Sequence, residues 1–108
     1  MITLGPYTAG EIPPPVVVTF TDAAGAPINI TGYAVRLVYR RDADTAVTRT
    51  GAVDNGASGI ASYTWVAADM ATAGSYRADM WVGNGTNRYA SQPIAWVIRE
   101  AVDTAPAI

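Results

Sequence analysis

Residues 69–82 read Asp-Met-Ala-Thr-Ala-Gly-Ser-Tyr-Arg-Ala-Asp-Met-Trp-Val and combine a corner with a strand. A glycine ends the alanine-rich turn, and from Tyr76 onward apolar residues occupy every second position. The side chains of a strand alternate between its two faces, so this period of two predicts a half-buried strand. Arg77 and Asp79 fall between the apolar positions and should face away from the core. We expect this strand to be central to the fold.

Tyr76 also follows an Ala-Gly corner and comes seven residues after Asp69. This arrangement is typical of the tyrosine corner of immunoglobulin-like sandwiches, in which the phenol hydroxyl bonds to upstream backbone. The alternative is an ordinary core tyrosine at the start of a strand. In either case strand parity predicts one shared core that contains Phe20, Leu37, Trp65, Tyr76 and Trp96.

The composition restricts the chemistry available to the chain. Half of its 108 residues are hydrophobic and only 15% are charged, which indicates an extensive interface or simply an alanine-rich sequence. Seven arginines against nine acids give a net charge of −2, so nothing favours binding to nucleic acid or an anionic membrane. The chain has no Cys and no His, which removes thiolate and imidazole chemistry and the usual metal ligands. We expect no enzyme activity and no cofactor.

The chain divides into three parts. Residues 1–14 form an extended N-terminal arm stiffened by prolines, residues 15–100 a β-sandwich, and residues 101–108 a flexible tail. The N-terminus lacks the features of a signal peptide, and no apolar run is long enough to cross a membrane. The arm could contact a neighbouring subunit as a mobile tether, or it could be the first edge strand of its own domain.

Alternating apolar residues and turn residues predict an all-β, immunoglobulin-like β-sandwich of seven to eight antiparallel strands. A single helical turn is expected within residues 66–73, which are too few for a stable helix. The expected strands are residues 16–21, 28–30, 33–41, 46–53, 60–65, 76–82, 87–92 and 94–99.

Several short motifs support a family resemblance. They are Asp-Ala-Ala-Gly-Ala-Pro at 22–27, Ile-Asn-Ile-Thr-Gly at 28–32, Tyr-Thr-Trp at 63–65 and Ala-Gly-Ser-Tyr-Arg-Ala at 73–78. From Gly10 to Arg99 the sequence resembles the immunoglobulin-like domain at the N-terminus of phage baseplate upper proteins, also found as a stand-alone chain among tailed-phage virion proteins. The triple proline and the lack of a C-terminal domain are departures, so the adaptor role of those relatives does not carry over whole. The resemblance implies a virion location and other virion proteins as partners, in many symmetric copies.

Candidate interface residues come from the outer positions of two strands and from the arm. Trp81 shares the parity of Arg77, and an exposed Trp near Arg is typical of a protein-interface hot spot. Trp81 could instead be covered by the arm or a neighbouring loop. The predicted protein interface consists of Ile2, Leu4, Tyr7, Arg36, Val38, Arg40 and Trp81.

Two functions follow from these observations. The first is a non-enzymatic structural protein of a tailed-phage particle, attached to capsid, neck, tail or baseplate. The alternative is a carbohydrate-binding or adhesion module that uses exposed Trp81 and Tyr89.

Other polar motifs are better explained by turns or solvated loops. The sequons at Asn29 and Asn84 lie where turns favour asparagine. A Ca²⁺ site at Asp42 and Asp44, or at Asp54 with Asn55, lacks the spacing of known loops. Asp69 and Asp79 could form an acid–base pair, but their spacing does not favour it.

Overall fold

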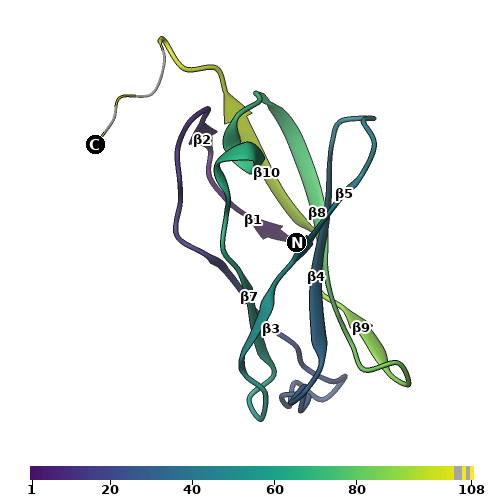
Figure 1. Ribbon diagram of the computed structural model, residues 1–108. Helices are drawn as coiled ribbons and strands as arrows, with labels where there is room; N and C mark the ends of the chain where they lie inside the picture. Colours follow the sequence, from purple (N-terminus) through teal and green to yellow (C-terminus); the bar gives the residue numbers. More distant parts are fainter. Residues whose placement is uncertain (104–105, 107) are drawn as a thin grey trace.

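The computed structural model describes residues 1–103, 106 and 108 (Figure 1). Part of the predicted flexible tail, at residues 104, 105 and 107, therefore lies outside the described residues. The described chain is all-β, as predicted, with its strands in two sheets and a single 3₁₀ turn. Hydrophobic residues of both sheets form one buried cluster between them.

The larger sheet, sheet A, is built around β8 as the sequence predicted. Its order is β1-β10-β8-β4-β5; in addition β2 pairs with β10, and β9 pairs with β8. Its strands are β1 (Ile2–Thr3), β2 (Tyr7–Thr8), β4 (Ala34–Arg41), β5 (Val47–Thr50), β8 (Gly74–Gly83), β9 (Arg88–Ala90) and β10 (Ile94–Arg99).

The smaller sheet, sheet B, has the order β3-β7-β6 and is antiparallel throughout. Its strands are β3 (Val16–Thr19), β6 (Ala52–Asn55) and β7 (Ile60–Tyr63). Between β7 and β8 the chain makes the 3₁₀ turn η1 (Ala67–Met70), so the single helical turn predicted within residues 66–73 is confirmed.

The single strand predicted for residues 46–53 is wrong, because the chain changes sheets at Gly51. Residues before it pair with β4 in sheet A, and residues after it pair with β7 in sheet B. A side chain does not fit at this crossing, since a Cβ atom on Gly51 would lie 2.5 Å from the Ser62 carbonyl oxygen and 2.8 Å from a Val35 methyl carbon. Half-buried and exposed positions keep alternating from residue 47 to residue 54, so the period of two does not reveal the crossing.

The strand predicted at residues 28–30 is also wrong. Asn29 Oδ1 accepts hydrogen bonds from the backbone N–H and the hydroxyl of Thr31, at 3.0 and 2.7 Å, which stabilises a turn. Ile30 is fully buried and its N–H donates to the carbonyl of Gly56. This segment therefore closes one end of the sandwich without extending a sheet.

The arm is the domain's own edge, which is the second of the two arrangements considered from the sequence. β1 and β2 pair in parallel with β10, with Ile2 opposite Ile94 and Tyr7 opposite Ile98. Leu4 N–H donates to the Ala95 carbonyl at 2.9 Å, in the stretch between the two short strands. The expectation that the arm has no strand partner is wrong, because β10 has a free edge that accepts these donors. The arm also adds two parallel strands to a sheet predicted to be antiparallel.

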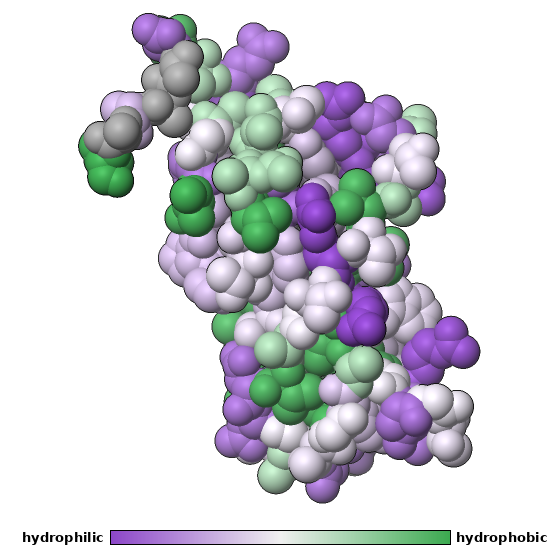
Figure 2. All heavy atoms as spheres, viewed as in Figure 1, coloured by the Kyte–Doolittle hydropathy of each residue, from purple (hydrophilic) through white to green (hydrophobic). Residues whose placement is uncertain are grey.

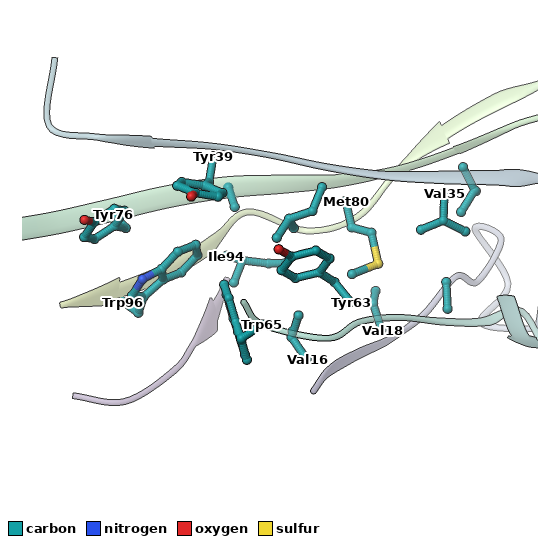
Figure 3. Packing of buried hydrophobic residues seen from close by; sticks show 14 of the residues in the cluster. Val16, Val18, Val35, Tyr39, Tyr63, Trp65, Tyr76, Met80, Ile94 and Trp96 are labelled. Carbon is teal, nitrogen blue, oxygen red and sulfur yellow. The ribbon is translucent and has the colours of Figure 1, made fainter. Parts of the chain in front are cut away.

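The predicted core is confirmed in all five of its members, which are buried in one cluster. Trp96 lies at its centre, with its ring stacked on Tyr76 at 5.4 Å between centroids and edge-on to Trp65 at 5.1 Å. Figure 3 shows these rings, from β8, β10 and the residues just after β7, facing one another between the sheets. Such aromatic contacts add about 0.5–1.5 kcal/mol per pair beyond the burial of area.

The hydrogen bond expected of a tyrosine corner is present. The hydroxyl of Tyr76 donates to the Thr72 carbonyl at 2.7 Å, four residues upstream. It ties the start of β8 to the end of the turn that crosses from sheet B to sheet A.

Candidate protein interface

The outer face of sheet A, turned away from the core, collects four of the predicted interface residues. The β4–β8 register places Arg36 opposite Trp81, and Val38 opposite Asp79. Arg40 lies on the same face two residues further along β4. The Trp81 side chain is 37% exposed, and both arginines are exposed, whereas Val38 is half-buried. The predicted alternation is therefore confirmed, and the pairing of β4 with β8 gathers these residues on one surface.

The three arm residues of the predicted interface lie elsewhere. Ile2, Leu4 and Tyr7 sit along the edge of β10 and are partly buried against the domain's own core. Burial, partly offset by a backbone hydrogen bond at Gly5, raises the pKa of Tyr7 above its ordinary value. Only the remaining exposed parts of these side chains are available to another chain.

The arginines are distributed unevenly over the molecule. Arg41 forms an ion pair with Asp44 at 2.8 Å, and Arg49 with Asp69 at 3.0 Å. The register places all the others on exposed positions of the outer face of sheet A: Arg36, Arg40, Arg77, Arg88 and Arg99. A chain with a net charge of −2 thus has one distinctly basic face.

The sequence indicates an outward position for Arg77 but not which strand lies beside it. In the structure Arg77 is directly opposite Arg40. In the described part of the chain, Arg36, Arg40, Arg77 and Arg88 make no ion pair. Asp79 is the one acidic residue on the strand positions of this face, and it is likewise not within ion-pair distance of an arginine there. The face is therefore available to groups of complementary charge.

A shallow hollow of about 330 Å³ lies on this face over β4 and β8. Its lining includes Val38, Arg40, Ala46, Arg77, Asp79 and Pro93. This lining mixes charged and apolar side chains. On the face of the molecule that Figure 2 shows, hydrophobic residues likewise lie in separate patches bordered by hydrophilic ones. A partner on the outer face of sheet A would meet a mixed surface, in which charge and a few apolar side chains both contribute.

Trp81 and Tyr89 do not form one sugar-stacking platform. In the β8–β9 ladder Trp81 lies opposite Ala90, while Tyr89 lies opposite buried Val82. Adjacent positions of a ladder point to opposite faces of the sheet. Tyr89 instead stacks on Tyr33, with ring centroids 6.3 Å apart and planes 8° from parallel.

Asp69 is the second notable polar feature, and sequence reasoning did not identify its partners. Its side chain is fully buried beside the core, yet it accepts four hydrogen bonds. Tyr39 Oη donates at 2.6 Å and Arg49 Nε at 3.0 Å to Oδ1, while Tyr63 Oη and the Val66 N–H donate to Oδ2. These donors come from β4, β5, β7 and the residue that precedes η1, so the carboxylate links both sheets to the crossing turn.

This environment shifts the pKa values of the whole cluster. Burial by itself would raise the pKa of Asp69, but the hydrogen bonds from Tyr39, Tyr63, Val66 and Arg49 outweigh it, and the pKa is lowered. Burial and the bond to Asp69 raise the pKa of Tyr39 to about 12 and that of Tyr63 further. Asp69 is thus held ionised with its oxygens occupied, and Asp79 lies on the opposite, outer face. The two do not form an acid–base pair.

The remaining sequence motifs have local roles. Asn84 Oδ1 accepts hydrogen bonds from the N–H groups of Thr86 and Asn87, which is the turn chemistry expected of this sequon. Over residues 1–103, 106 and 108, no group of three or more acidic side chains is placed to hold a metal ion. No helix in the same residues has the length and apolar character needed to cross a membrane.

Comparison with known proteins identifies the family. The model of the BppU N-terminal domain family, the N-terminal domain of the phage baseplate upper protein, matches residues 18–107. The chain belongs to this family. The match confirms the resemblance seen in the sequence and the virion location that it implied. No curated protein matches the chain.

Proposed function

We propose that this protein is a non-enzymatic structural component of a tailed-phage particle, associated with the baseplate and held there by protein–protein contacts. The carrying observation is that four predicted interface residues from two strands meet on the outer face of sheet A. Membership of a baseplate family supports other virion proteins as the partners. The proposal includes many symmetric copies of the chain in the particle. Trp81 together with Arg36 supplies the residue types that dominate binding energy at protein interfaces.

We also infer that the two sheets form an immunoglobulin-like sandwich. The order β10-β8-β4-β5 corresponds to strands G, F, C and C′ of that fold, and β3-β7-β6 corresponds to B, E and D. The Tyr76 hydroxyl bond at the start of β8 supports this assignment. The buried tryptophans differ in place, since Trp65 follows β7 and Trp96 lies on β10, whereas antibody domains carry theirs on strand C.

The available side-chain chemistry supports a structural rather than a catalytic role. The sequence has no His and no Cys. The buried carboxylate of Asp69 has all its neighbouring donors engaged and a lowered pKa, so it is poorly suited to accept a proton near neutral pH.

Purified particles of the phage that encodes this chain provide the test. Quantitative mass spectrometry of gradient-purified virions should detect the chain in a fixed ratio to other baseplate proteins. Trp81→Ala should fold normally but reach the particle in smaller amounts, with Val17→Ala, exposed on β3 of sheet B, as the matched control. A chain abundant in infected cells but absent from purified virions would refute the proposed function.

A further inference from the structure

Two arginines face each other across the β4–β8 ladder of sheet A, near one of its ends. Arg40 lies directly opposite Arg77 in the β4–β8 ladder. Directly opposed positions bring Cβ atoms to about 4.5–5.5 Å, where like charges are destabilising. Both side chains are exposed, and neither has an acidic partner within ion-pair distance in the described chain. The domain on its own therefore keeps two positive charges adjacent, and neither forms an ion pair.

The surroundings of this pair favour a carboxylate. The hollow of about 330 Å³ on this face is lined by both arginines and by Val38. The planar guanidinium group of arginine binds a carboxylate through two parallel hydrogen bonds, a geometry that lysine does not match. Asp79 lies at the same hollow, so an extended polyanion would meet a repulsive group there. A single carboxylate placed between the arginines avoids this repulsion.

We propose that Arg40 and Arg77 together bind an aspartate or glutamate side chain of a neighbouring virion protein. This proposal rests on the proposed function and specifies the chemistry of the partner at the same face. The partner's adjoining apolar side chains contact Val38 and Trp81. Binding brings a negative charge between two repelling positive ones, so the contact gains both the new ion pairs and the relief of the repulsion. A nucleic-acid partner is disfavoured by Asp79 and by the net charge of −2.

Arg77→Gln tests this proposal because it should act in opposite directions on folding and on assembly. Loss of the like-charge contact should raise the thermal midpoint of the isolated chain by about 1–5 °C. Copies per purified particle should fall by at least about fivefold, because a charge-assisted contact is lost. Thr19→Glu, an exposed substitution on β3 of sheet B, changes the net charge equally and should leave incorporation unchanged. Arg77→Lys should restore part of the incorporation.

A photo-crosslinking side chain at Thr48 identifies the partner's chemistry. Thr48 is exposed and lies opposite Val38 on the same face. In assembled particles it should crosslink to a peptide that contains aspartate or glutamate, whereas the same group at Thr19 should not. Crosslinking to DNA, or to a peptide without acidic residues, would overturn the proposal.

The two hypotheses fail in different ways. If the unmodified chain is absent from particles, the proposed function is wrong. If the unmodified chain and Arg77→Gln enter particles equally well, only the carboxylate site is wrong.

Discussion

Replacing Asp69 by asparagine should strongly destabilise the domain, since it removes the charge to which four donors are directed. Asparagine keeps one carbonyl oxygen for Tyr39 and Arg49, but its amide group then faces the other two donors. A buried N–H left without an acceptor, here that of Val66, costs about 1–3 kcal/mol. Breaking a buried ion pair costs about 3–5 kcal/mol, and the one-third exposure of Arg49 favours the lower end. We expect a total loss of about 3–4 kcal/mol.

That loss is a large fraction of the about 5–15 kcal/mol by which a domain of this kind is stable. It should lower the thermal midpoint by roughly 12–25 °C, measured by circular dichroism at pH 7. Asp79→Asn is the matched control, because it makes the same change of charge at an exposed position and should shift stability by less than about 0.5 kcal/mol. If the free energy of unfolding of Asp69→Asn lies within about 1 kcal/mol of that of the unmodified protein, the typical effect of an ordinary substitution, the reasoning about this cluster is refuted.

The same cluster gives a pH dependence. The pKa of Asp69 is lower in the folded chain, so its contribution to stability is complete above the ordinary carboxyl pKa of about 4 and is lost as the pH falls through the folded value. The pKa of Tyr39 is raised to about 12 in the folded chain. Its contribution to stability is therefore complete below the ordinary phenol pKa of about 10 and is lost as the pH rises through the raised pKa. Urea unfolding from pH 2 to pH 7 should therefore show a steeper acid loss for the unmodified protein than for Asp69→Asn. Parallel curves would contradict this assignment.

Three further substitutions test the fold. Tyr76→Phe removes the hydroxyl bond to the Thr72 carbonyl and should cost about 1 kcal/mol in urea unfolding; no change would show that the corner bond is dispensable. Gly51→Ala introduces a Cβ atom 2.5 Å from a carbonyl oxygen and should cost about 1–3 kcal/mol, while Ala52→Gly next to it serves as control. Deleting residues 2–12 exposes the β10 edge and removes the half-buried arm side chains, so the free energy of unfolding of the isolated chain should fall by about 2–4 kcal/mol. An unchanged thermal midpoint would favour a tether.

The sequence by itself determined which face of each long strand is buried. Alternation is a local property, so the inward positions of Leu37, Tyr76 and Trp96 and the outward positions of Arg36 and Trp81 follow from the chain alone. The all-β class and the turn at Asn84 are likewise encoded within a few residues.

Tertiary structure decided what lies beside what. The crossing at Gly51 depends on the space left by Val35 and Ser62, and the arm became an edge strand because β10 offered unpaired backbone groups. Neither condition is visible in a single segment of sequence. The pairing of Arg40 with Arg77 joins residues 37 positions apart, and the bond from Tyr39 to Asp69 joins residues 30 positions apart. Both depend on which strands pair, and hydrophobic alternation does not specify this. The basic face is thus a property of the register of β4 with β8 rather than of either strand.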